Sequence, residues 1–205
     1  LSGVWAVFVD GMDQCVLIDQ RTYPQRTTSE PDQDKSFRGS RDGFVETMVF
    51  NAALIRRRIR SPRLCVEHLE VGETSRTDVA VCYFEGRADP ELVNTVRERI
   101  AQARVDALTM NQESLAELLV RKRWYNPFPK FKFTERPDAA AAQILEGDVV
   151  VLVDNSPAAI ILPTTLFDVM EEANDYYFPP ITGSYLRLVR FFTTFLTTFL
   201  TPVWL

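Results

Sequence analysis

The sequence predicts an α/β fold of two small subdomains, joined by two linkers and followed by the start of a transmembrane helix. Apolar runs without polar alternation, at residues 149–153 and 158–162, are typical of strands covered by helices on both faces. Apolar residues at helical spacing, as in residues 44–59, indicate those covering helices. Residues 191–205 carry no charge, which favours a membrane segment.

The most regular stretch runs from Lys130 to Pro163. Its two apolar runs flank Asp154-Asn155-Ser156-Pro157, a sequence typical of a turn, and therefore predict a hairpin. Ahead of the hairpin, Pro137 suits the first turn of a helix and Gly147 suits its end. We expect the order strand, helix, strand, strand, with the hairpin at the centre of a sheet.

A second hairpin is predicted at the N-terminus, where residues 5–9 and 15–18 are apolar and Asp10-Gly11 is a strong turn signal. Neither hairpin is expected to be stable alone. We therefore expect both in one sheet, with Val7 and Val151 in one core. Asp10 and Asp154 are interpreted as turn residues rather than as a catalytic pair of carboxylates.

A long helix is predicted to follow the segment Arg38-Gly39-Ser40-Arg41-Asp42-Gly43, in which Ser40 or Asp42 can cap it. An anion site at this helix entry is the alternative, but the segment lacks the phosphate-loop pattern. The expected core-facing stripe consists of Phe44, Met48, Ala52, Ile55 and Ile59.

Phe50 and Leu54 lie roughly opposite that stripe and are flanked by Arg57 and Arg58. An exposed apolar pair beside charged residues is typical of a contact surface. The contact is either a partner subunit or another layer of the same fold. These four residues form the candidate interface.

Residues 61–127 are predicted to form a ββαβα subdomain, inserted into a discontinuous subdomain of residues 1–60 and 128–180. The strands of the insert are expected at residues 64–71, 79–84 and 105–108. Two subdomains joined by two linkers enclose a cleft, where a small ligand can bind. Residues 181–205 are the expected juxtamembrane segment and start of the first transmembrane helix.

The composition argues against several classes of function. The 205 residues carry a formal net charge of −5, which disfavours general nucleic-acid binding. The three cysteines are widely spaced and the single histidine, His68, has no second ligand candidate, so we expect no metal site. No catalytic or dinucleotide-binding pattern occurs, and we expect neither an enzyme nor a cofactor.

The C-terminal run is interpreted as part of a membrane span that begins near Arg190, since a span needs about 20 apolar residues. The alternative is a helix that docks on the soluble core. Arg187 and Arg190 precede the run and favour a cytoplasmic position for the preceding domain. The chain begins at Leu1, so we expect an upstream segment in the full protein.

Four segments together resemble the spore-germination receptor A-subunit family: RGSRDGF (38–44), ALIRRRIR (53–60), TERPD (134–138) and EGDVVVLVDNSP (146–157). Three further segments, RWYNPFPK, ILPTTLFDV and TGSYLRLVRF, narrow the resemblance to one group within that family. The residues that carry this candidate structural motif are Arg38, Gly39, Arg41, Gly43, Glu135, Arg136, Asp154 and Pro157.

The resemblance implies a cytosolic domain at the N-terminus of an integral protein of the endospore inner membrane, which promotes germination. It implies no catalytic residues. The leading hypothesis is an assembly module that forms a homo-oligomer, contacts other germination membrane proteins of the same operon and couples to an ion-conducting complex. A small-ligand sensor that uses the cleft between the subdomains is the alternative.

Overall fold

The computed structural model describes residues 4–11, 13–19, 27–31, 40–103, 112–119, 131–165 and 180–204. Its strands are β1 (Val4–Phe8), β2 (Cys15–Asp19), β3 (Leu64–Val71), β4 (Thr77–Phe84), β5 (Lys132–Thr134), β6 (Val149–Val153) and β7 (Ala159–Leu162). Its helices are α1 (Met48–Arg58), α2 (Pro90–Ala101), α3 (Gln112–Leu119), α4 (Pro137–Glu146) and α6 (Pro180–Trp204). The strand predicted at residues 105–108 and the linker at 123–130 lie outside the described residues.

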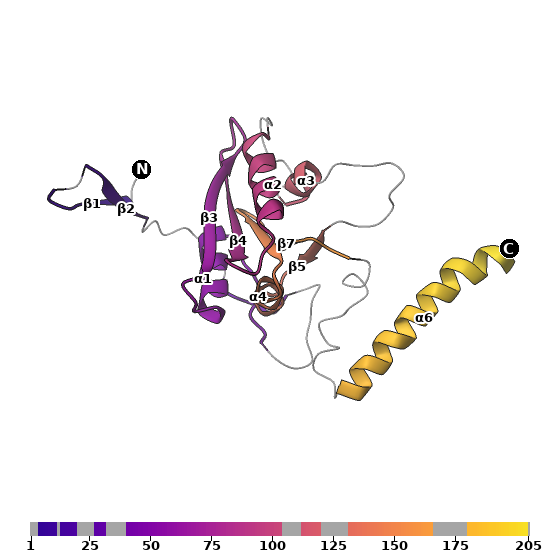
Figure 1. Cartoon of the computed structure of the whole chain (residues 1–205). Helices are drawn as coiled ribbons and strands as arrows, with labels where there is room; N and C mark the ends of the chain where they lie inside the picture. Colours follow the sequence, from indigo (N-terminus) through magenta and orange to yellow (C-terminus); the bar gives the residue numbers. More distant parts are fainter. Residues whose placement is uncertain are drawn as a thin grey trace.

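An antiparallel five-stranded sheet of order β3-β4-β6-β7-β5 forms the centre of the molecule (Figure 1). All five residues of β6 are buried, and alternate ones join two separate core clusters. Val150 and Leu152 pack with residues of α1 and α4, whereas Val151 packs with residues of α2 and α3. The apolar run of β6 is thus covered by helices on both faces, as its sequence predicts.

Element order around α4 confirms the prediction of strand, helix, strand, strand, as β5, α4, β6 and β7. Pro137 occupies the first turn of α4. Gly147 ends the helix with φ of 117°, and an added Cβ there would approach the backbone oxygen of Arg87 to 2.9 Å. Both the left-handed conformation and this close approach favour glycine.

The strand pairing differs from a division of the chain into two subdomains. Strands β3 and β4 come from the expected insert, yet β4 pairs with β6, with Val81 opposite Val151. The reason is that β4 buries apolar side chains on both faces and takes a partner strand on each edge. The β4–β6 ladder thus joins segments of both expected subdomains in one sheet.

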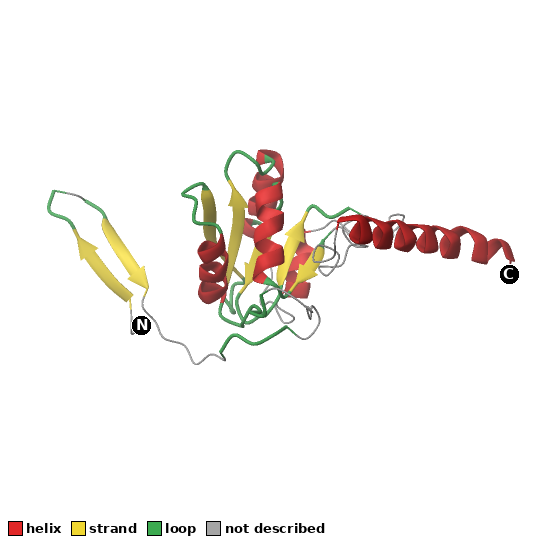
Figure 2. Ribbon diagram, turned by 90° about the horizontal axis from the view of Figure 1, so that it is seen from below, coloured by secondary structure: helices red, strands yellow, loops and turns green. Residues whose placement is uncertain are grey.

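The N-terminal hairpin contradicts the prediction that both hairpins share one sheet. Strands β1 and β2 form their own two-stranded sheet, and Val7 is 44% exposed whereas Val151 is fully buried. Both edges of the β6–β7 hairpin are already occupied, by β4 and β5. The β1–β2 hairpin therefore cannot pair beside β6 or β7, and it stands apart from the five-stranded sheet (Figures 1 and 2).

Helix α6 continues without a break from Pro180 to Trp204 and extends away from the sheet (Figure 1). Its large apolar side chains are exposed, among them Phe192, Phe195 and Phe199. Within the described residues, no helix combines the length and the apolar character that a membrane crossing requires.

Candidate functional site: polar contacts around helix α1

The segment before α1 is extended and held by backbone contacts, so the helix starts at Met48 rather than near Phe44. The Gly43 N–H donates to the Ser29 carbonyl at 2.9 Å, and the Phe44 N–H donates to the Glu135 carbonyl at 2.8 Å. A Cβ on Gly43 would lie 2.8 Å from the Ser29 oxygen. Only glycine fits here without a shift of the backbone.

Asn51 fixes the same segment from inside the helix, and it is buried. Its Oδ1 accepts from the Val45 N–H at 2.8 Å, and its Nδ2 donates to the Val45 carbonyl at 2.5 Å. A buried amide must satisfy its polar atoms, and both contacts do so. Sequence reasoning missed Asn51, although a polar residue inside an apolar helical stripe is a signal for such a role.

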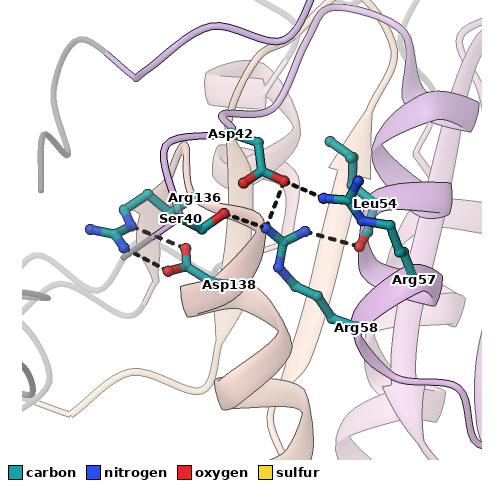
Figure 3. A network of polar contacts seen from close by, with 7 residues as sticks. All are labelled: Ser40, Asp42, Leu54, Arg57, Arg58, Arg136 and Asp138. Carbon is teal, nitrogen blue, oxygen red and sulfur yellow. Dashed lines mark hydrogen bonds and ion pairs between the residues drawn. The ribbon is translucent and has the colours of Figure 1, made fainter. Parts of the chain in front are cut away.

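Asp42 is the centre of a charged network (Figure 3). Its Oδ2 lies 2.6 Å from an Nη of Arg57 and 2.8 Å from an Nη of Arg58. Arg58 also donates to the Ser40 hydroxyl at 3.0 Å and to the Leu54 carbonyl at 3.2 Å. Burial alone would raise the pKa of Asp42, but the hydrogen bond and charge of Arg58 and the charge of Arg57 lower it.

Arg136 and Asp138 form a second ion pair at the start of α4 (Figure 3). Arg136 is only 2% exposed and donates two parallel hydrogen bonds to the Asp138 carboxylate, at 3.0 and 2.6 Å. Burial favours a raised pKa for Asp138, but the contacts with Arg136 outweigh it and lower the pKa. Helix α4 packs against α1, so the two ion pairs belong to neighbouring helices.

The turn between β6 and β7 caps α1 from a distant part of the chain. Asp154 Oδ1 accepts from the Met48 N–H at 3.0 Å, and the Asn155 N–H donates to the Glu46 carbonyl at 2.8 Å. Thr47, at the N-cap position, makes no side-chain cap bond. Asp154 thus supplies the oxygen that an N-cap residue usually provides.

The same turn also reaches α3 on the opposite face of the sheet, because the Ser156 hydroxyl hydrogen-bonds the side chain of Gln112. Asn155 adopts φ of 59°, a left-handed conformation that asparagine tolerates. Pro157 is half-buried in this turn. The prediction of a turn at 154–157 is confirmed, and its contacts to two helices are a finding of the structure.

The predicted interface residues do not form an exposed apolar pair. Leu54 is 6% exposed and belongs to the core cluster of α1 and α4, and Phe50 packs against that cluster. The buried face of α1 is rotated relative to the predicted stripe, since Asn51 and Leu54, which are not part of that stripe, are buried, whereas Val49 is 55% exposed. The packing of α4 beside α1 is the reason, because it covers the flank that carries Leu54.

Of the other residues in the candidate structural motif, Arg41 is exposed, and Arg38 and Gly39 lie outside the described residues. Glu135 takes part through its backbone carbonyl, as described above. The residues brought together around α1 are therefore Ser40, Asp42, Gly43, Asn51, Arg57, Arg58, Glu135 and Asp154.

A further network joins β3, β4 and α2 and was not predicted. Glu67 accepts from Tyr83 at 2.6 Å and from two nitrogens of Arg97 at 2.6 and 2.9 Å. The hydrogen bond from Arg97 lowers the pKa of Glu67, and the bond to Glu67 raises the pKa of Tyr83. Sequence distance hides this cluster, because its members come from three separate elements.

These contacts hold elements in position, and they bring together no nucleophile with a general base. Among the described residues, no group of three or more His, Cys, Asp or Glu side chains is placed to bind a metal ion. The chemistry of the site is that of ion pairs and helix caps around α1.

Comparison with known proteins assigns the family. The family model described as "Bacillus/Clostridium GerA spore germination protein" matches residues 1–205. Stage V sporulation protein AF of Bacillus subtilis (strain 168) is 50% identical over 204 residues, which cover 100% of this chain and 41% of that protein. Spore germination protein A1 of the same organism is 32% identical over 205 residues, 100% of this chain and 42% of that protein.

A solved structure is also similar, the N-terminal domain of the A subunit of the Bacillus megaterium spore germinant receptor GerK3. It has a TM-score of 0.47 and 32% sequence identity, and the match covers 60% of this chain and 97% of that one. This chain spans about two fifths of the length of the curated relatives it matches. The resemblance inferred from the sequence motifs is confirmed, and the chain belongs to the Bacillus/Clostridium GerA spore germination protein family.

Proposed function

We propose that this chain is the cytosolic domain of an integral membrane protein that promotes germination of bacterial spores. Its role is to support oligomerisation and to couple to a membrane ion-conducting complex. The observation that carries the proposal is the family match over residues 1–205, with 50% identity to a stage V sporulation protein. A relative that is 30% identical over 204 residues is named as a membrane protein.

Helix α6 supports membrane contact. Its residues after Arg190 carry no charge, and Phe192, Phe195 and Phe199 expose more than half of their surface. Exposed aromatic side chains on an uncharged helical segment are costly in water and favourable in a bilayer. Arg187 and Arg190 stand at the start of this segment and favour a cytoplasmic position for the sheet, which is the core side of the spore inner membrane.

The packed α1–α4 region supports an assembly role rather than catalysis. Its arginine–aspartate contacts and its long-range caps hold α1 firmly against the sheet, and Arg57 remains largely exposed while it binds Asp42. Such a rigid surface suits protein contacts, for which other germination membrane proteins of the same operon are the proposed partners.

Vesicle flotation tests the membrane part of this proposal. We expect the chain to float with vesicles of phosphatidylethanolamine and phosphatidylglycerol. The double variant Phe195→Asp with Phe199→Asp should lose at least about tenfold in partitioning, because it places charge in the apolar segment. Val49→Asp with Leu145→Asp is the matched control, since it adds the same two charges at exposed apolar positions that lie on α1 and α4. Equal flotation of the two variants would contradict membrane contact through α6.

Germination itself tests the functional part. Spores from which the full-length protein has been deleted should lose refractility more slowly after exposure to nutrients, and the restored gene should return the normal rate. A full-length protein recovered in the soluble fraction of disrupted spores, together with an unchanged germination rate in the deletion, would refute the proposal.

A further inference from the structure

The β1–β2 hairpin exposes apolar side chains on both of its faces. Phe8 and Leu17, on one face by strand alternation and register, are 78% and 66% exposed. Trp5 and Val16, on the other, are 65% and 59% exposed. A two-stranded hairpin is marginally stable at best, so this one needs a further strand and cover from outside itself. Among the residues that the structure describes, the chain itself supplies neither.

Strand β3 is an edge that can accept such a strand. In the described part of the chain it pairs with β4 alone, along all eight of its residues. Its free edge presents backbone N–H and C=O groups that pair readily with an added strand. Strand β1 has five residues and is short enough to pair with β3 over its full length.

Charge gives the pairing a direction. The hairpin turn exposes Asp10 and Asp13, and the segment just before β3 exposes Arg60 and Arg63. When the turn lies beside these arginines, β1 runs antiparallel to β3, because β1 leads towards the turn and β3 leads away from Arg63. An antiparallel addition continues the pattern of the whole five-stranded sheet.

We propose that the β1–β2 hairpin of one copy of this chain adds to the β3 edge of a second copy, with Asp10 and Asp13 facing Arg60 and Arg63. The inference rests on the oligomerisation proposed above and names its contact. Each copy has one β1–β2 hairpin and one β3 edge, so the interface is head-to-tail. Every copy can add its hairpin to one neighbour and bind the hairpin of another at its β3 edge. A second copy is the occupant because the chain itself carries two surfaces that match in strand form and in charge.

Charge reversal on each surface tests the pairing, with molecular mass measured by light scattering on the 205-residue chain in a mild detergent. The hairpin variant is Asp10→Arg with Asp13→Arg, and the edge variant is Arg60→Asp with Arg63→Asp. Each alone should weaken association by at least about tenfold, since it places like charges together. The two variants mixed should associate again, because each hairpin then finds an edge of opposite charge.

Glu98→Arg with Glu113→Arg is the control, because both glutamates are exposed, lie on α2 and α3 rather than on the hairpin or on β3, and give the same change in net charge as the hairpin variant. It should associate like the unmodified chain. Circular dichroism checks that each variant is folded, and the milder pair Asp10→Asn with Asp13→Asn replaces a hairpin variant that is not.

Three other results would overturn the proposal. If the unmodified chain is monomeric, both the hairpin contact and the proposed oligomerisation fail. If the unmodified chain associates and the hairpin variant associates equally well, oligomerisation stands and the hairpin contact fails. If both variants are monomeric and their mixture remains monomeric, the hairpin docks elsewhere, either on its own chain or on another protein.

Discussion

Asp154 and Asp42 show how single carboxylates join parts of the chain that are distant in sequence. Asp154 caps α1 across a separation of 106 residues, and Asp42 ties the segment before α1 to Arg57 and Arg58 at the end of that helix. The turn chemistry of Asp154 is visible in the sequence, but its role as a helix cap is not. Capping preferences concern neighbours in sequence, and here the acceptor comes from another hairpin.

Replacing Asp154 by alanine should lower the free energy of unfolding by about 1 kcal/mol, because the Met48 N–H loses its acceptor. Asp154→Asn keeps an Oδ1 acceptor and should lose less. The free energy is measured by urea denaturation of both variants. Equal losses in the two variants would mean that the charge of Asp154, rather than its cap bond, stabilises the fold.

Acid should destabilise the protein through Asp42 and Asp138. Both have a pKa below the ordinary value of 3.8 in the folded chain, where their arginine partners favour the charged form. Their stabilisation is therefore complete above pH 3.8 and is lost as the pH falls through the lower, folded pKa values. The urea midpoint should fall as the pH is lowered from about 4 towards about 2, and less steeply in Asp42→Asn. If the urea midpoint of Asp42→Asn falls with pH as steeply as that of the unmodified chain, Asp42 does not contribute to the acid sensitivity.

Helix α1 illustrates what periodicity can and cannot predict. The helix itself and the burial of Met48 and Ile55 follow from apolar spacing. The covered flank does not, because Val49 and Leu54 are both apolar and only the position of α4 decides which one is buried. Apolar spacing therefore predicts the buried face of α1 only approximately. The packing of α4, which is distant in sequence, determines which neighbouring residues are also buried.

Leu54→Asp should therefore reduce the free energy of unfolding by several kcal/mol, since it places a charge within the core cluster of α1 and α4. Val49→Asp is the matched control on the same helix and should change the stability by less than about 0.5 kcal/mol. Thermal unfolding of both variants measures the difference. If the Leu54→Asp chain is folded and as stable as the unmodified chain, Leu54 is not a core residue and its interpretation as an exposed contact residue is favoured.

The five-stranded sheet combines strands that the sequence assigns to two different subdomains, namely β3 and β4 from one and β5, β6 and β7 from the other. Local patterns predict the strands β3, β4, β6 and β7 correctly, together with the helix between β5 and β6. They do not encode which strands pair when the pairing residues are far apart in the chain, as β4 and β6 are. For the same reason the N-terminal hairpin is predicted as an element, while its separation from the sheet becomes visible only in the structure.

A disulfide across β4 and β6 tests the continuity of the sheet. Val81 and Val151 are register partners in this antiparallel pair and are both buried in one core cluster, so cysteines there lie within reach of a disulfide. Val81→Cys with Val151→Cys, oxidised after folding, should form an intramolecular bond and resist urea to a higher midpoint than its reduced form, while each single variant should form no such bond. If the introduced cysteines at positions 81 and 151 both stay reduced in the folded, oxidised double variant, β4 and β6 belong to separate subdomains; peptide mapping distinguishes them from Cys15, Cys65 and Cys82.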